Sequence, residues 1–357
     1  MTGHRTRDSG RGTPRGGGPR GFRDASTAAY AVAACLAAAP PGAAHASDSA
    51  LEILPLRIAN QNPLVQIHGL PAGESAALLP PGTARAELAF DVANLYTSDA
   101  SASEELEYDG ETHRLTLRYR RGIGSGWQVG ADLPFVAHDG GFLDGFIYNW
   151  HDFFGLPQHG RERSDDGLLA ITYARDGATR IDLRTRQSGV GDLRLLAGYP
   201  LSSPGDRMTT AAHASLSLPT GDAGSLLGSG AVELALWGSG RISFGPHADW
   251  AAYGSAGALW MDQGEVLPEL QRSLAGFASL GLGWRPADWI TLQLQLDGHT
   301  ALYDDTELSP LGPALQFTMG GSLRLAPRLR LDLAVVEDAT IGRAPDIGLH
   351  LNLRWDH

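Results

Sequence analysis

The chain has 357 residues, of which 43% are apolar and 19% charged, a composition typical of a folded protein rather than a disordered one. Its net charge of −12 argues against nucleic acid as a partner, because binding to phosphates requires a basic surface. The single cysteine, Cys35, lies in an alanine-rich stretch near the N-terminus, and removal of that stretch would exclude disulfides and cysteine-based metal sites.

Residues 1–46 have the organisation of a secretory signal peptide. Six arginines precede residue 25, an apolar run follows from Ala25 to Ala39, and Ala44-His45-Ala46 supplies small residues where signal peptidase cleaves. We predict cleavage after Ala46 and export of the remaining chain. Lipidation at Cys35 is the alternative, but the apolar run that precedes it is short for a signal.

Residues 47–83 contain five prolines and show no strong hydrophobic periodicity. We expect this stretch to form an N-terminal segment that lies in the periplasm or inserts into the lumen of the barrel that follows.

From residue 84 onward, segments of about ten residues alternate apolar and polar side chains, as from Ile290 to Asp297. Alternation gives a strand one apolar and one polar face, and tilted transmembrane strands of about 9–11 residues have this pattern. About fourteen segments qualify, at 84–96, 112–121, 127–136, 168–176, 180–186, 192–200, 209–218, 231–243, 247–260, 272–285, 289–299, 314–326, 328–337 and 346–355.

The connections between these segments alternate between short and long, as in bacterial barrels with short periplasmic turns and long extracellular loops. Trp127, Trp250 and Trp289 lie near the short connections, as a girdle of aromatic residues at one membrane interface would. We therefore predict that residues 84–357 form a transmembrane antiparallel β-barrel of the cell outer membrane, with about 14 strands and 12 or 16 as alternatives. A soluble β-sandwich would also alternate, but its strands average about five or six residues.

Inward-facing positions of the predicted strands carry polar and charged side chains, which can pair with one another or line a water path. The predicted lumen-facing residues are Glu87, Asp91, Arg118, Arg120, Asp132, Gln293, Gln295, Asp297, Arg324, Arg330, Asp332 and Arg354.

The long connection at 137–167 contains a stretch with helical periodicity from 142 to 154. Gly155 and Pro157 end the predicted helix. It either packs over the barrel mouth or at the interface, or forms a gate for an apolar ligand. The apolar side chains of that gate would be Leu143, Phe146, Ile147, Trp150 and Phe154.

Several short stretches resemble an uncharacterised family of Gram-negative outer-membrane β-barrels, a domain of unknown function. They are Asn60-Gln61-Asn62-Pro63-Leu64, Gly140-Gly141-Phe142-Leu143-Asp144, Gly189-Val190-Gly191-Asp192-Leu193 and Leu218-Pro219-Thr220-Gly221-Asp222. The last two also occur in barrels that transport hydrophobic compounds. The resemblance covers about residues 50–357 and implies the fold and the location, but no specific activity.

The sequence contains none of the common hydrolase, metalloprotease, P-loop or dinucleotide motifs, so we predict neither an enzyme nor a cofactor or metal site. The main hypothesis is a channel or transporter for small molecules, apolar ones included. The alternatives are a structural or assembly barrel with a filled lumen, and a lipid-modifying enzyme. Expected partners are outer-membrane lipid, lipopolysaccharide and, because the last strand ends near Trp355, the barrel insertion machinery.

Overall fold

Alternating side chains produce fifteen antiparallel strands in the part of the chain that the computed structural model describes, which is residues 1, 50–141, 168–203, 206–340 and 342–357. The predicted signal peptide, Met1 apart, and the predicted helix at 142–154 lie outside these ranges. Residues 1–47 and 48–357 are separate units, and all the strands belong to the second.

Twelve of the described strands close into a barrel. They are β1 (Ala84–Ala100), β2 (Glu104–Gly122), β3 (Gln128–Asp139), β7 (Leu193–Pro200), β8 (Met208–Leu218), β9 (Glu233–Phe244), β10 (Trp250–Met261), β11 (Leu274–Ala287), β12 (Ile290–His299), β13 (Ala314–Ala326), β14 (Leu329–Asp338) and β15 (Ile347–Asp356). Each pairs with its neighbour along the chain, and β1 pairs with both β2 and β15. The barrel wall is therefore closed, as the backbone of a membrane-spanning sheet requires.

Two strands that the sequence predicts lie outside the barrel. β4 (Ala170–Arg175) pairs with the outer half of β2, and β5 (Ala178–Leu183) pairs with β4. All fourteen predicted segments are strands, but these two have only six residues each, fewer than the about 9–11 that cross a bilayer. The barrel itself thus has the twelve strands of the lower predicted count.

The short strand β6 (Gln187–Val190) pairs with the end of β3 and is almost continuous with β7. The two are separated at Gly191 and Asp192, opposite Pro134 of β3. Because proline has no backbone N–H, Pro134 cannot donate a ladder hydrogen bond to the opposite strand. Its carbonyl still accepts one, from the Gly191 N–H over 2.9 Å. The interruption divides one wall strand into two pieces.

The connections fall into two classes at the two ends of the barrel. Short turns join β2 to β3, β7 to β8, β9 to β10, β11 to β12 and β13 to β14. Longer connections lie at the other end, except that residues 101–103 join β1 to β2 there. By the rule for bacterial barrels, the short turns mark the periplasmic end and the long loops the extracellular end. The predicted segments 84–96 and 112–121 leave residues 97–111 as a long connection, but β1 and β2 extend through most of this range as a hairpin beyond the barrel.

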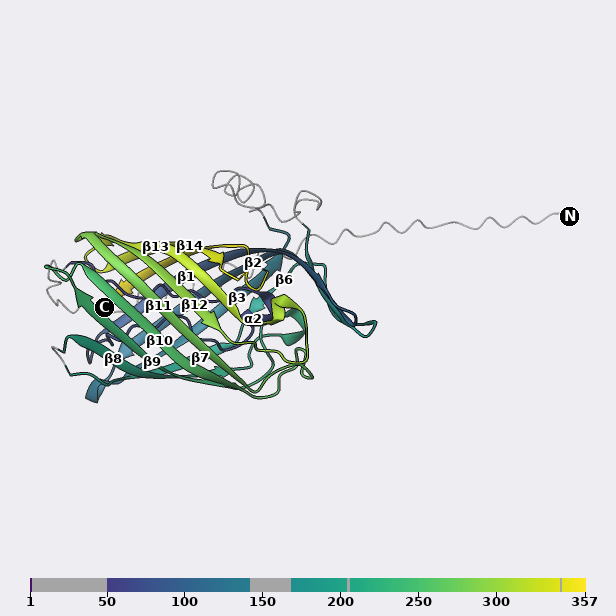
Figure 1. Ribbon diagram of the computed structural model, residues 1–357, viewed down its shortest axis with the longest axis horizontal. Coiled ribbons are helices and arrows are strands. Elements are labelled where there is room, and N and C mark those ends of the chain that lie inside the picture. The colour runs from purple at the N-terminus through teal and green to yellow at the C-terminus, as the bar shows by residue number, and fades with distance from the viewer. Residues whose placement is uncertain (2–49, 142–167, 204–205, 341) are drawn as a thin grey trace. The chain divides into compact units, whose positions relative to one another are not determined.

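The helices within the described residues are all short. They are α2 (Pro63–Gln66) and the 3-10 turns η1 (Gly124–Gly126), η3 (Ala223–Ser225) and η4 (Ser309–Leu311). No helix within the described ranges is long and apolar enough to cross a membrane. Figure 1 shows the tilted strands, with α2 at the end opposite the C-terminus.

The outward positions of the strands carry large apolar side chains. On β12, Leu292, Leu294 and Leu296 are 38–49% exposed, whereas Gln293 and Gln295 between them are buried. Aromatic rings lie at the periplasmic end, where the Trp127 and Tyr199 rings are 4.9 Å apart. An apolar belt bordered by aromatic residues is the surface that a bilayer accommodates.

Depth in the bilayer should decide the effect of a charge on the outer face. Leu294→Arg, at mid-strand, should lower the free energy of unfolding in lipid vesicles by about 2–4 kcal/mol, and Leu325→Arg, near the periplasmic end, by about 0–1 kcal/mol. Urea titration of both variants in vesicles measures the difference. Equal losses would show that the belt does not lie across the bilayer as described.

The two ends should differ in accessibility on intact cells. Ala102→Cys lies at the tip of the β1–β2 hairpin, and His247→Cys lies in the short turn between β9 and β10. A membrane-impermeant maleimide should label the first variant and not the second, because the mature chain predicted from the sequence has no other cysteine. Labelling at position 247 on intact cells would invert the assignment of the ends.

Candidate functional site

Residues 50–83, hereafter the lumen segment, run through the interior of the barrel. At the periplasmic end, the Leu51 N–H donates to the Asp288 carbonyl over 2.9 Å. The segment then reaches the extracellular end at α2 and returns to Thr83, beside Gly122 in the periplasmic half of β2, before β1 begins. It therefore passes along the lumen twice, and its contacts reach strands all around the wall.

The turn between the two passes is built from the Asn60-Gln61-Asn62-Pro63 stretch. The Asn62 side chain accepts a hydrogen bond from the Leu64 N–H over 3.0 Å, which caps α2, and Pro63 occupies its first turn. The Asn62 amide also donates to the Pro310 carbonyl over 3.0 Å, and Asn60 lies 3.1 Å from the ring of His299. This motif thus ends the first pass and attaches it to the extracellular loops.

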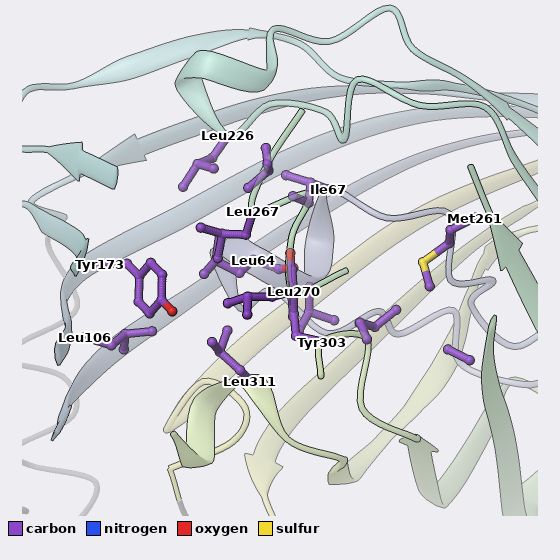
Figure 2. Packing of buried hydrophobic residues seen from close by; sticks show 14 of the residues in the cluster. Leu64, Ile67, Leu106, Tyr173, Leu226, Met261, Leu267, Leu270, Tyr303 and Leu311 are labelled. Carbon is purple, nitrogen blue, oxygen red and sulfur yellow. The ribbon is translucent and has the colours of Figure 1, made fainter. Parts of the chain in front are cut away.

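Apolar side chains from α2 and from the long loops form one buried group at the extracellular end, hereafter the mouth cluster. It contains Leu64, Val65 and Ile67 from the lumen segment, together with residues from loops and strand ends that include Leu226, Leu267, Leu270, Tyr303 and Leu311. In Figure 2, Leu64 and Ile67 lie among these side chains. The mouth cluster resembles the core of a soluble protein and lies at the extracellular end of the barrel.

Between the two ends, wall side chains bind the lumen segment largely through its backbone. Gln295 on β12 both accepts from the Leu56 N–H (3.0 Å) and donates to the Leu56 carbonyl (2.8 Å). Other such bonds run from Arg285 to Leu51 O (3.2 Å), Arg241 to Ile53 O (3.0 Å), Arg114 to Gln66 O (3.1 Å), Arg194 to Leu70 O (3.1 Å), and from Leu79 N to Gln128 (2.9 Å). These bonds satisfy backbone groups that water would otherwise satisfy.

Charged side chains hold the second pass against β1, β2 and β3. Glu74 accepts from Arg57 over 2.7 Å and from Arg120 over 2.6 Å. Arg120 also donates to Asp132 over 2.6 Å, and Arg57 lies 3.4 Å from Glu87. Four of the five side chains are nearly fully buried, so each charge depends on its neighbours for stabilisation.

A second polar group fixes the segment just below the mouth cluster. His68 Nδ1 lies 2.7 Å from Glu233 Oε1, and the Gly69 N–H donates to the other oxygen of the same carboxylate. Tyr303 lies 3.1 Å from His68 Nε2 and donates to the Leu64 carbonyl over 2.7 Å. Burial raises the pKa of Tyr303, so its hydroxyl keeps the proton that this last bond requires.

The residues predicted to face the lumen fall into three groups. Glu87, Arg120 and Asp132 contact the lumen segment or its partners, as do Gln293 and Gln295 through Tyr253 and Leu56. Wall-to-wall contacts join Asp91 to His350 (2.6 Å), Asp332 to Arg354 (2.6 Å) and Asp297 to Gln295 (2.8 Å). Arg118 is buried and pairs in register with Glu87 on β1 and Asp132 on β3. Arg324 and Arg330 lie at the periplasmic rim, where Arg324 donates to the Asp288 carbonyl and Arg330 is 3.7 Å from Asp356.

The five predicted gate residues, Leu143, Phe146, Ile147, Trp150 and Phe154, lie outside the described residues. Sequence reasoning missed other residues that hold the lumen segment. Arg114, Arg194 and Glu233 occupy polar positions of alternating strands and could have been found there. Arg57 and Glu74 could not, because residues around them have no periodicity.

The Gly-Val-Gly-Asp-Leu and Leu-Pro-Thr-Gly-Asp stretches meet at the break between β6 and β7. Asp192 accepts hydrogen bonds from the backbone N–H groups of Gly221 (2.8 Å) and Ser229 (3.0 Å). A Cβ on Gly228 would lie 2.3 Å from the Asp192 carboxylate, so only glycine fits there. The two stretches therefore hold the loop between β8 and β9 against the interrupted strand, a structural role.

One Ser–His contact tests the enzyme hypothesis. His213 Nε2 lies 2.7 Å from the Ser239 hydroxyl, but both side chains are buried and face the lumen. The other ring nitrogen of His213 has no carboxylate within hydrogen-bond distance among the described residues, and the ring stacks on Trp237. This pair lacks the orienting acid and the access to lipid that a lipid-modifying site needs.

Comparison with known proteins supports the fold. The family model described as "Protein of unknown function (DUF3187)" matches residues 31–357. Among solved structures, the COG4313 outer membrane channel from Pseudomonas putida F1 is similar, with 15% identity, coverage of 78% of this chain and 96% of that chain, and a TM-score of 0.51. At this identity the likeness concerns the fold alone, which is that of a transmembrane β-barrel.

More remote similarities are to the CymD monoaromatic hydrocarbon channel (11% identity, 85% and 94% coverage, TM-score 0.37) and the P. putida toluene transporter TodX (11%, 77% and 87%, 0.32). At these scores neither supports an argument about this chain. Among curated proteins, none matches the sequence significantly.

Removal of a buried charge from the segment should be costly. Glu74→Gln leaves Arg57 and Arg120 with one carboxylate fewer and should lower the free energy of unfolding by about 3–5 kcal/mol. Glu52→Gln makes the same change in a half-exposed ion pair, 3.1 Å from Arg241, and should cost less than about 1 kcal/mol. Urea titration followed by gel mobility compares them. Similar midpoints would mean that Glu74 does not hold the segment.

Proposed function

The chain belongs to this family of unknown function, and on that premise we propose that it is an outer-membrane channel for small molecules that residues 50–83 close. One observation carries the proposal, namely that the barrel wall behind the lumen segment is polar and charged. The outer-membrane channel of similar fold supports only the barrel architecture in this proposal.

A permanently filled barrel needs polar wall side chains only where they bind the segment, because other buried polar groups are costly unless they are paired. This wall instead presents buried carboxylates, guanidinium groups and amides, among them Glu87, Arg118, Gln293, Asp332 and Arg354. Such a wall remains stable when water replaces the segment, and it can then line a path for small solutes. We infer that the lumen is built to be opened.

The way in which the segment is held is consistent with this inference. Gln295 and Arg194 bind its backbone rather than its side chains. Arg241 binds the Ile53 carbonyl as well as the Glu52 carboxylate. Water can replace each of these hydrogen bonds, and the net stabilisation from each is only about 0.5–1.5 kcal/mol, or about 1.5–3 kcal/mol where the donor is charged. Displacement of the segment from the middle of the lumen is therefore less costly than its number of contacts suggests.

The mouth cluster supports the inclusion of apolar molecules among the substrates. A solute that arrives from the outside meets loops whose buried side chains include Leu226, Leu267, Leu270 and Tyr303. An apolar molecule can take the place of Leu64 or Ile67 there without exposing apolar surface to water. The polar wall below suits small solutes of mixed character.

The second candidate is a structural or assembly barrel with a permanently filled lumen. The mouth cluster also favours this candidate, because it joins α2 to the loops as firmly as a protein core. We do not propose an enzyme, since the similar folds are channels and the His213–Ser239 contact lacks an orienting acid.

We place the protein in the outer membrane, with lipid and lipopolysaccharide around the belt formed by the outward leucines. Outward apolar side chains on the barrel strands support this location, apart from the polar outer face near Glu111 and His113. Trp355 near the end of β15 supports recognition by the barrel insertion machinery.

A reversible cross-link tests whether the segment closes the channel. A Cβ on Gly283 of β11 would lie 3.5 Å from the Ile53 Cβ, within the range of a disulfide. Ile53→Cys with Gly283→Cys should give no conductance in planar bilayers when oxidised and should open when reduced. The two single variants are controls and should not respond to reduction.

A variant lacking residues 51–79 completes the test. It should conduct continuously, because it lacks the part of the segment that contacts the wall from Leu51 to Leu79. Equal conductance of the double-cysteine variant in its oxidised and reduced forms would show that the segment is not the gate. A folded deletion variant that never conducts would favour the filled structural barrel.

A further inference from the structure

The outer face of the barrel carries three possible metal ligands at the extracellular end of β2 and β3. Glu111 and His113 are two residues apart on β2 and therefore share its outward face. Asp139, the last residue of β3, pairs in register with Glu111. The sequence alone could not bring the third ligand to the other two, because it depends on the pairing of the two strands.

Two of the distances between the donor atoms are close to those around a tetrahedral metal ion. His113 Nε2 lies 3.1 Å from Asp139 Oδ1 and 3.4 Å from Glu111 Oε2. Ligands at about 2.0–2.1 Å from zinc are about 3.3–3.4 Å apart at the corners of a tetrahedron. One atom from each of the three residues lies within 4.8 Å of the others. One ion can thus contact all three after small adjustments.

The surroundings hold the ligands in place. Gly141 has a φ of +75°, and a Cβ there would lie 1.9 Å from the Glu111 carboxylate carbon, so glycine leaves the space that this carboxylate occupies. The Gly141 N–H donates to Asp139 over 2.9 Å, and the His113 ring stacks on Phe90. Such outer contacts orient ligands in metal sites.

We propose that Glu111, His113 and Asp139 bind a divalent transition-metal ion of the zinc type. The imidazole favours zinc over calcium or magnesium, which prefer oxygen ligands alone. Three protein ligands leave room for a fourth, and His113 and Asp139 help to line a hollow of about 530 Å³. Water or an outer-leaflet headgroup can take that position.

The location suggests what the ion does. At Glu111 and Asp139, β2 ends its pairing with β3, and from Asp109 to Glu104 it pairs with β4 instead. An ion that joins β2 to the last residue of β3 fastens the wall where the ladder changes partner. The site is separate from the lumen, so it does not depend on the proposed channel.

Without a metal, the same geometry would be a hydrogen-bonded group in which His113 lies between two carboxylates. The two interpretations differ in their response to zinc. Tag-free mature protein in detergent, treated with chelator, is titrated with zinc chloride by calorimetry, and its heat-modifiable gel mobility is followed as a function of temperature. His113→Asn and Asp139→Asn are compared with His247→Asn, an exposed histidine at the periplasmic end.

Zinc should bind with one ion per chain and raise the temperature at which the barrel unfolds. Each ligand variant should weaken binding more than about tenfold, since even the loss of an outer contact costs about 10–100-fold. His247→Asn should bind as the unmodified chain does. Zinc K-edge absorption of the unmodified protein should show one imidazole and oxygen ligands, which tests the site even if a variant fails to fold. No zinc-dependent stabilisation, or equal affinity in both ligand variants and the unmodified chain, would overturn the proposal.

Discussion

The ladder between β1 and β15 joins the two ends of the sheet, from Arg85 opposite Asp356 to Asn94 opposite Ile347. This closure separates an outer face, which must be apolar, from an inner one, which need not be. It also fixes the width of the lumen at twelve strands. About eight strands give an interior that side chains alone can fill. A twelve-stranded barrel must therefore hold either water or another part of the chain, and residues 50–83 occupy it.

Part of the chemistry of the wall follows from that occupancy. A segment with little regular secondary structure brings N–H and C=O groups that lack backbone partners into the lumen. Wall side chains such as Gln295 and Arg241 bind these groups, and they can do so whatever the sequence of the segment. Where the segment carries its own charges, as at Arg57 and Glu74, the wall supplies opposite ones. At the extracellular end, where α2 turns, apolar packing replaces these bonds. The same interior thus contains polar contacts that water can replace and an apolar contact that it cannot.

The sequence predicts the wall well and its contents poorly. Alternation from Ile290 to Asp297 predicts both the strand β12 and its inward glutamines, because one strand is enough to define two faces. Alternation does not specify partners, so the segments that became β4 and β5 could not be placed outside the barrel by pattern alone. The path of residues 50–83 depends on contacts such as that of Leu56 with Gln295, 239 residues away. No local pattern contains that information, and the same holds for Asp139 beside His113.

The occupied lumen is tested most directly by hydrogen–deuterium exchange of the unmodified mature protein in lipid nanodiscs, read peptide by peptide. Backbone bonds of Leu51, Leu56 and Leu79 to the barrel predict that amides of residues 51–79 exchange far more slowly than those of an unstructured peptide. Protection should be greatest around α2, beneath the mouth cluster. Exchange of the whole segment at the rate of a free peptide, with the strands still protected, would contradict the account.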